Sequence, residues 1–423
     1  MQLNRTIAPD FQTVQSVHFP AATHLLLDNG MPLYVINLGQ QPVVRLEIVF
    51  EAGTWSETVA GSSFFTLKML SEGTKSHTSA QISERFDEIG AFIDLSHSAD
   101  RANLTVYGLT KHLEAILQLA QELLNEATFP ENEFDTLKNV SLQNLRVNLE
   151  KNSYLATIKF RQLLFGNAHP YGRSQNEADI SKLTTQHLRD FYEQSIQNQP
   201  FKVFLSGQIA QKETDLVNQY LGKQAINLTP KPAPQHQRTP PTTTSFVAEK
   251  PDAVQSSLRL GRPLFTRQHP DFYPFMVCNE VLGGYFGSRL VKNIREEKGL
   301  TYGISSGLSL LRRDGFWTVS ADVKKESVEL VFDEIFQEIA ELQRNIVPED
   351  ELETVKNYLS GEFAGALNTP FEIADRVRLM ALENLPLDFY TQHIASLRAV
   401  SAEQIRTMAQ KYWQSADLLR VVV

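Results

Sequence analysis

The chain has 423 residues, of which 42% are apolar and 21% charged, and its formal net charge is −9. This composition supplies material for two or more cores, and the acidic balance excludes nucleic-acid or anionic-membrane binding through a basic surface. Cys278 is the only cysteine, which excludes internal disulfides and zinc sites made of cysteines. Residues 1–20 have no apolar core of signal-peptide length and no later run could span a membrane, so we expect a cytoplasmic protein.

The first half of the chain has the pattern of antiparallel strands with helices grouped against them. Asn29 and Gly30 form a turn dipeptide between two apolar runs, which predicts a hairpin. Apolar residues alternate with Arg45 and Glu47 over 44–50, as in a strand with one face in water. We expect further strands at 92–98, 103–109 and 203–206, and helices at 57–70, 79–89 (capped by Ser79), 112–125, 131–149, 156–164 and 185–192. This arrangement indicates an α+β fold rather than a parallel βαβ sheet.

A proline-rich run at 228–241 divides the chain near its middle and predicts an extended linker. On either side of it, PENEFDTLKN at 130–139 matches PEDELETVKN at 348–357 with a constant offset of 218. Each segment follows an amphipathic helix, at 113–124 and at 328–342. We therefore predict two homologous repeats, each an antiparallel or mixed sheet covered by helices, facing each other across a ligand-binding cleft. The predicted domains are 1–227 and 246–423, with the linker at 228–245.

The stretch LGGYFGSRLVKNIREEKGLTY at 282–302 predicts a glycine turn, a helix at 288–298, a stop at Gly299 and a strand at 300–311. The helical spacing places Leu290, Val291 and Ile294 on one apolar face. Arg295 lies in the last turn of that helix, and Tyr302 lies at the start of the strand. A short turn between them would place a guanidinium and a phenol over one cleft. Taken alone, such an arginine is more often a solvated helix end, and such a tyrosine is more often half-buried packing.

This stretch resembles the second-half motif of the pitrilysin/insulinase (inverzincin) family of zinc peptidases. The first half adds the segments LDNGMPLYVI, VFEAGTWSE, MLSEGT, HPYGR and LSGQI in suitable order, so the resemblance covers nearly the whole chain. It implies that Arg295 holds the substrate backbone and that Tyr302 donates a hydrogen bond to the oxyanion of the tetrahedral intermediate. The residues that we expect to contact substrate around this pair are Gly283, Gly284, Ser288 and Arg289.

Members of this family that cleave peptides carry His-x-x-Glu-His on the first long helix. Two histidines one turn apart hold Zn²⁺, and the glutamate activates a bound water. The matching positions here are Phe64, Leu67 and Lys68. Phenylalanine has no donor atom, and a lysine ammonium repels a divalent ion. The third ligand should fall near Asn144, where neither the residue nor its neighbours Gln143 and Leu145 are carboxylates. We therefore expect no metal and no other cofactor on this chain.

Other catalytic patterns are weak. The ten histidines include no pair at i, i+4. We expect His97, near Asp100, to be an isolated polar group at the surface, and His169 to be a turn residue. A Gly-x-Ser-x-Gly match around Ser305 lacks the strand-to-helix elbow that serine hydrolases need, because strand residues continue through 308–311.

The family includes two-chain enzymes in which one chain keeps the zinc and the other keeps the Arg/Tyr pair, and this sequence resembles the second kind. The resemblance implies a zinc-free subunit of a heterodimeric metallopeptidase, inactive alone. It would bind a peptide along a sheet edge and supply Arg295 and Tyr302 to a zinc-bearing paralogue with His-x-x-Glu-His. The alternative is a structural or peptide-binding homologue without peptidase activity, like the family's respiratory-complex core subunits. A self-sufficient peptidase with unrecognised ligands is a third reading, and a homodimer in isolation is left open.

Overall fold

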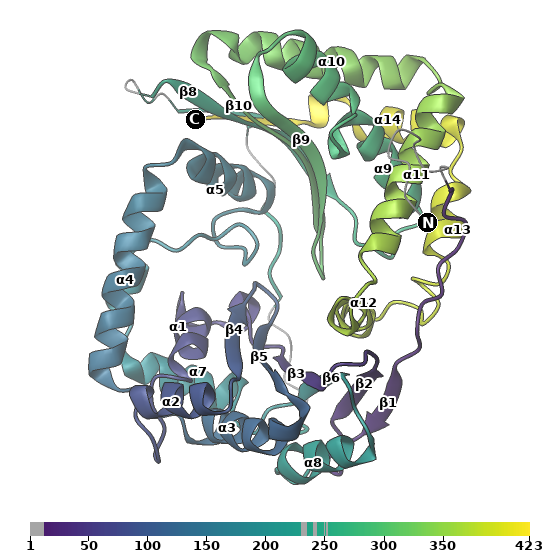
Figure 1. Ribbon diagram of the computed structural model, residues 1–423. Coiled ribbons are helices and arrows are strands. Elements are labelled where there is room, and N and C mark those ends of the chain that lie inside the picture. The colour runs from purple at the N-terminus through teal and green to yellow at the C-terminus, as the bar shows by residue number, and fades with distance from the viewer. Residues whose placement is uncertain (1–11, 230–234, 240–242, 249, 251–252) are drawn as a thin grey trace, which may run out of the picture.

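The computed structural model describes residues 12–229, 235–239, 243–248, 250 and 253–423. They form two β-sheets and many helices, which confirms the predicted α+β class. In Figure 1 the two repeats lie opposite each other, the first coloured purple to teal and the second green to yellow. No helix among these residues is long and apolar enough to cross a membrane.

The first repeat contains a six-stranded sheet with the order β1-β2-β6-β3-β5-β4. Its neighbours are antiparallel except β2 and β6, which are parallel. The strands are β1 (Thr23–Leu26), β2 (Pro32–Asn37), β3 (Val43–Phe50), β4 (Phe92–His97), β5 (Ala102–Leu109) and β6 (Phe201–Gly207). The helices are η1 (Thr54–Ser56), α1 (Ser62–Met69), α2 (Ser79–Glu88), η2 (Thr110–His112), α3 (Leu113–Glu126), α4 (Glu131–Leu149), α5 (Asn152–Phe165), α6 (Glu177–Lys182), α7 (Thr185–Ser195) and α8 (Gln211–Leu221).

The second repeat contains a five-stranded sheet with the order β7-β11-β8-β10-β9, in which only β7 and β11 are parallel. Its strands are β7 (Ser245–Val247), β8 (Gln255–Leu264), β9 (Thr301–Leu310), β10 (Gly315–Lys324) and β11 (Leu419–Val422). Its helices are α9 (Phe272–Asn279), η3 (Glu280–Gly284), η4 (Val291–Glu297), η5 (Lys325–Ser327), α10 (Val328–Arg344), α11 (Glu349–Gly365), α12 (Pro370–Glu383), α13 (His393–Arg398), α14 (Ala402–Tyr412) and η6 (Ser415–Asp417).

The duplication predicted from one short sequence match extends through the structure. Helices α4 and α11 start at Glu131 and Glu349, and helices α5 and α12 start at Asn152 and Pro370, so both pairs keep the offset of 218. In each repeat an antiparallel hairpin, β4–β5 or β9–β10, precedes these helices. The two halves of the chain are therefore homologous repeats of one α+β unit.

Each repeat places one helix on the sheet of the other. Helix α5 packs against β8 and β11 of the second sheet, and α12 packs against β2 and β6 of the first (Figure 1). Phe160 of α5 meets Phe316 of β10 with ring centroids 6.0 Å apart. Leu382 of α12 is buried with Val49 and Phe204 of the first sheet. This exchange joins the repeats through apolar cores rather than through the linker alone.

The predicted water-facing side of β3 is wrong, because α12 covers it. Arg45 and Glu47 are only 5% and 4% exposed. Their partners come from α12, where Asp375 lies 2.9 Å from the Arg45 guanidinium and Arg378 donates to Glu47 at 2.9 Å. The alternation of polar and apolar residues in β3 marks a strand between two packed layers, and the layer under α12 holds both these ion pairs and apolar contacts.

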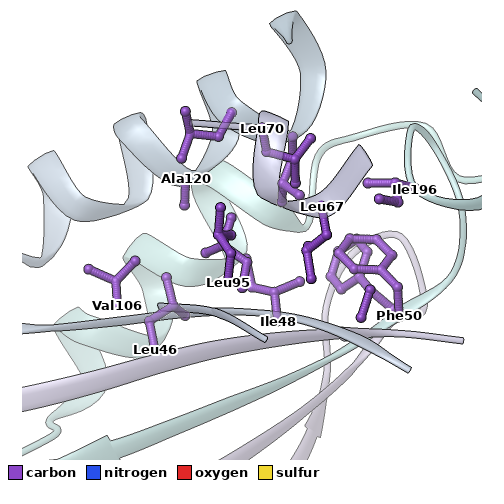
Figure 2. Close-up of a cluster of buried hydrophobic side chains, with 14 of the residues drawn as sticks. Leu46, Ile48, Phe50, Leu67, Leu70, Leu95, Val106, Ala120 and Ile196 are labelled. Carbon is purple, nitrogen blue, oxygen red and sulfur yellow. The ribbon is translucent and has the colours of Figure 1, made fainter. Parts of the chain in front are cut away.

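The core of the first repeat lies between its sheet and the helices on the opposite face. In Figure 2, Leu46, Ile48 and Phe50 of β3 point toward Leu67 of α1 and Leu95 of β4. Leu67 is 1% exposed. The residue at the predicted position of the catalytic glutamate is therefore a core residue in this chain.

One predicted helix start and one predicted helix cap need correction. Helix α1 begins at Ser62 rather than near Glu57, because Gly61 before it has a left-handed φ of 88°. The Glu57 carboxylate accepts from the backbone N–H groups of Gly61 and Ser63 at 3.2 and 3.1 Å. Helix α2 is capped by Thr78 in a capping box, and Ser79 is its first residue.

The division into 1–227, 228–245 and 246–423 stays a prediction, and residues 230–234 and 240–242 of the predicted linker lie outside the described residues. The described part at 235–239 lies against the first repeat. The His236 ring is 4.8 Å from the Trp55 ring between centroids, and the Thr239 N–H donates to the Phe165 carbonyl at 3.2 Å.

Candidate functional site

The glycines of the second-repeat motif permit a close approach of two backbones. Gly283 and Gly284 end the π-helical segment η3, and neither has a left-handed φ, so the predicted glycine turn is corrected: the chain turns after them, from Tyr285. A Cβ on Gly283 would lie 3.0 Å from the backbone N of Ser306 in β9. Glycine is required there because η3 lies directly on the strand.

The helix predicted at 288–298 is mostly the π-helix η4, which spans Val291–Glu297. Its buried face, which includes Leu290 and Ile294, is the one that the spacing predicts. The predicted stop is confirmed: Gly299 has φ +62°, and the Leu300 N–H donates to the Ile294 carbonyl at 2.9 Å. π-Helical turns are uncommon and occur frequently at functional sites.

The Arg295 side chain lies over an aromatic ring of the preceding loop. Its guanidinium carbon is 4.7 Å from the ring centroid of Phe286, a residue that is 65% exposed. No carboxylate among the described residues forms an ion pair with Arg295. The contact with the Phe286 ring positions the Arg295 guanidinium, and the N–H donors of this group form no ion pair with a described carboxylate.

Tyr302 projects from a β-bulge in the edge strand of the second sheet. The register of β9 against β10 shifts here, so that Tyr302 and Gly303 together oppose Asp322. The Thr301 hydroxyl donates to the Asp322 carbonyl at 2.7 Å and accepts from the Gly303 N–H at 3.1 Å, which fixes the bulge. A bulge re-aims a side chain, and the Tyr302 side chain is 91% exposed.

The structure brings Arg295 and Tyr302 onto consecutive elements but not into contact, since no hydrogen bond or ring contact joins the two side chains. Ser288 and Arg289 support the loop before them. Ser288 is 1% exposed, and Arg289 makes a two-point ion pair with Glu351 of α11 at 2.9 and 2.7 Å. The substrate contacts expected of Gly283, Gly284, Ser288 and Arg289 stay predictions.

The positions that match the zinc motif do not fit a metal ion. The Phe64 ring packs edge-on against Phe65, with centroids 5.2 Å apart, and Leu67 lies in the core (Figure 2). The Lys68 ammonium donates to the Leu95 carbonyl, so a fixed cation stands beside the place of the missing ligands. Within the described parts of the chain, no three His, Cys, Asp or Glu side chains are grouped to hold a metal ion.

His97 was expected at the surface, and this is wrong. The Ser63 hydroxyl gives its hydrogen to Glu57 at 2.7 Å, so His97 Nε2, 2.6 Å from the same hydroxyl oxygen, acts as the donor to it. Burial, with a smaller effect from the Lys68 ammonium, lowers the pKa of His97 to about 4. His97 is therefore a neutral, partly buried group. Its expected neighbour Asp100 instead accepts from the Tyr171 hydroxyl at 2.9 Å.

A pocket of about 300 Å³ opens beside these residues, which we call the Phe64 pocket. Its walls include Glu57, Phe64 and His97, together with Arg161 of α5 and Arg173 of the HPYGR segment. Arg173 forms an ion pair with Glu57. Sequence reasoning missed Glu57, Arg161 and Arg173. The only signal was the HPYGR segment, which contains Arg173 but does not indicate which surface it faces.

Two other sequence expectations are confirmed. His169 is a buried turn residue whose Nδ1 accepts from the Tyr171 N–H at 3.1 Å. Ser305 lies within β9 and pairs with Ser320 of β10, so the strand-to-helix elbow of a serine hydrolase is absent there.

Family models match both repeats. Residues 34–167 match the family described as "Insulinase (Peptidase family M16)", and residues 182–359 match the one described as "Peptidase M16 inactive domain".

Relatives and a solved structure agree with these matches. The "Uncharacterized zinc protease YmxG" of Bacillus subtilis is 23% identical over 401 residues, which cover 93% of this chain and 96% of the relative. The "Non-peptidase homolog YmxG" of Helicobacter pylori is 24% identical over 378 residues, covering 84% and 82%. A crystal structure of a peptidase M16 inactive domain from Pseudomonas fluorescens has a TM-score of 0.83 at 22% identity, covering 95% of this chain and 97% of that one. This likeness supports the same two-repeat fold.

Proposed function

We propose that this chain, which belongs to the M16 insulinase family of peptidases, is the zinc-free subunit of a heterodimeric metallopeptidase. It binds a peptide and supplies Arg295 and Tyr302 to the active site of a zinc-bearing family paralogue. The observation that carries the proposal is the Tyr302 side chain, which is 91% exposed and projects from a β-bulge in β9. The chain's own metal positions, Phe64 and Lys68, do not fit zinc.

The chemistry of the two side chains suits this role. A phenol O–H donates to negative charge that develops on a carbonyl oxygen, and one such donor is worth about 3–4 kcal/mol in a transition state. The planar guanidinium of Arg295, held by Phe286, can donate to peptide carbonyls. Zinc on the partner subunit would supply the activated water and polarise the scissile bond.

The peptide would bind along β9. This strand is the edge of its sheet, so its outer N–H and C=O groups have no strand partner within the sheet. An extended peptide can add to such an edge by main-chain hydrogen bonds. Tyr302 lies at the beginning of β9, where a peptide bound along the strand would pass the phenol.

The proposal is tested by assembly and by one substitution. The tagged chain is recovered from its native host, and the eluate is assayed for co-purifying chains, zinc and cleavage of quenched peptides. We expect a zinc-bearing chain with His-x-x-Glu-His, about one zinc per pair, and activity only from the pair. Tyr302→Phe should leave assembly intact and lower turnover roughly 100- to 1,000-fold. Tyr358→Phe, at a tyrosine that is 42% exposed in the same repeat, is the matched control. Unchanged turnover of the assembled Tyr302→Phe pair would refute the role of the phenol.

The alternative is a binding or structural protein without peptidase activity. The H. pylori relative is named as a non-peptidase homolog, which favours this alternative. In that case the chain elutes without a zinc-bearing partner and the eluate cleaves no peptide, and size-exclusion chromatography shows whether it pairs with itself. A cytoplasmic location is part of both proposals, and cell fractionation tests it.

A further inference from the structure

Arg161 is a half-buried cation without an acidic partner. It lies on α5, and its Nε donates to the Tyr171 carbonyl at 2.7 Å. Among the described residues, no carboxylate forms an ion pair with it, whereas its neighbour Arg173 is paired with Glu57. Its terminal nitrogens are not among the buried side-chain atoms that lack a hydrogen-bond partner. Arg161 also lines the Phe64 pocket. The terminal N–H donors of Arg161 are therefore not sealed from solvent, and none of them makes a hydrogen bond to a described residue.

Glu57 and Arg173, two other charged groups of the pocket, are paired with each other. Besides Arg173, the Glu57 carboxylate takes hydrogen bonds from Gly61 and Ser63. Asp179, the second carboxylate in the wall, accepts from the Asn176 side chain at 2.6 Å and makes no ion pair with Arg161. A buried cation costs free energy unless a counter-charge meets it. The pocket therefore favours a ligand that brings its own anion.

The polar atoms of the wall also favour an N–H group close to that anion. His97 uses its Nε2–H toward Ser63, so its Nδ1 carries a free lone pair in the neutral ring. The Asp179 carboxylate retains acceptor capacity. The Phe64 ring and Ala60 add apolar surface. A carboxylate, an adjacent N–H and a modest apolar side chain are the parts of the last residue of a peptide.

We propose that the Phe64 pocket binds the C-terminal carboxylate of a peptide, with Arg161 as its cationic partner. The volume of about 300 Å³ is at the small end of ligand pockets, which fits one or two residues rather than a long segment. The chain would thus hold a peptide end in the surface where family enzymes hold zinc. This inference rests on the proposed handling of peptides, but it requires neither a partner subunit nor Tyr302.

The test is calorimetric titration of the purified full chain with an N-acetylated tripeptide, Leu-Ala-Phe, as the free acid and as the C-terminal amide. We expect the acid to bind at least tenfold more tightly than the amide. Arg161→Gln should remove this preference, and Arg161→Lys should keep part of it. Ala60→Leu reduces the pocket volume while Arg161 is left unchanged, and it should weaken binding of the tripeptide acid at least tenfold. Arg146→Gln, at an exposed arginine of α4 paired with Glu177, is the control that should bind like the wild type.

Three results would overturn the proposal. The first is equal binding of acid and amide, or no binding of either. The second is wild-type binding by both Arg161→Gln and Ala60→Leu, with folding verified by thermal unfolding. The third is acetate competing as strongly as the tripeptide acid, which would show a general anion site. Tyr302→Phe separates this inference from the proposed function, because it should keep the acid preference even where turnover is lost.

Discussion

Replacing Arg378 by methionine should destabilise the protein in a pH-dependent way. The Arg378 guanidinium donates to Glu47 at 2.9 Å across the contact between α12 and β3, and Glu47 is buried. Burial raises the pKa of Glu47 above its ordinary value of 4.5 even with Arg378 and Arg45 nearby. Without Arg378 the pKa of Glu47 rises further, and the carboxyl group avoids the cost of its charge by taking up a proton.

Protonation of Glu47 limits how much free energy of unfolding the Arg378→Met variant can lose. A carboxyl group whose pKa is higher in the folded chain than in the unfolded chain destabilises the fold increasingly as the pH rises above 4.5. Keeping Glu47 protonated costs about 1.4 kcal/mol for each pH unit above its ordinary pKa of 4.5. The cost is therefore at most ~4 kcal/mol at pH 7.5 and ~1.4 kcal/mol at pH 5.5. Because Arg45 remains nearby, we expect Arg378→Met to lose about 2–3 kcal/mol at pH 7.5 and about 1 kcal/mol at pH 5.5.

Urea unfolding followed by circular dichroism at the two pH values measures this difference. The double variant Glu47→Gln/Arg378→Met should recover most of the loss, and its stability difference from the wild type should not increase between pH 5.5 and pH 7.5, because position 47 no longer has a carboxyl group to ionise. Arg344→Met removes an exposed ion pair with Glu341 and should change stability by less than about 0.5 kcal/mol. A loss at pH 7.5 no greater than at pH 5.5 would refute this account of the buried pair.

Three further changes test other parts of the structure. Thr301→Val removes the hydroxyl that fixes the bulge and should cost about 1 kcal/mol in thermal unfolding, with turnover of an assembled pair reduced roughly tenfold. Gly283→Ala should cost about 1–3 kcal/mol in urea unfolding, because its Cβ would approach the Ser306 backbone. Burial lowers the pKa of His393 to about 4 from 6.5, so the folded state should lose about 3 kcal/mol as the pH falls from 6.5 to 4. His393→Gln should flatten that part of the stability–pH curve.

Each of these has a distinct contrary outcome. Gly361→Ala, in the α11 interior with open space around its Cβ, should be neutral or stabilising, and a loss equal to that of Gly283→Ala would remove the steric argument. Wild-type turnover of the Thr301→Val variant would show that catalysis does not depend on the bulge that carries Tyr302. An unchanged stability–pH slope in His393→Gln would mean that other groups, His97 among them, account for acid destabilisation.

The sequence was sufficient for features that depend on neighbouring residues. Strand alternation predicted β3, the Asn29-Gly30 turn predicted the β1–β2 hairpin, and Gly299 marked the end of a helix because a left-handed residue is needed there. The 288–298 segment gave the right buried residues but the wrong helix type. A helix wound to π spacing around Val291–Glu297 keeps the same inward face, so the pattern of apolar residues cannot distinguish it from an α-helix.

Features that depend on residues far apart in the sequence could not be predicted from local patterns. The burial of Glu47 is caused by Arg378, 331 positions away in the sequence, and no local pattern indicates that α12 covers β3. The same applies to His97, which is partly buried and hydrogen-bonded to Ser63 of α1, 34 positions earlier in the sequence. For the lost zinc site, by contrast, residue chemistry sufficed, since Phe64 and Lys68 exclude zinc ligation in any arrangement.

The exchanged helices bear on how a chain of this kind could have arisen. A single repeat expressed alone would leave one sheet face without its covering helix, exposing the apolar surface that α5 or α12 now covers. Two identical single-repeat chains could cover that surface for each other by trading the helix symmetrically, as in a domain-swapped dimer. Fusion of two such copies would then need only a connecting segment, after which each copy was free to change separately. A gene fragment encoding either repeat should accordingly yield a dimer or an aggregate, not a folded monomer.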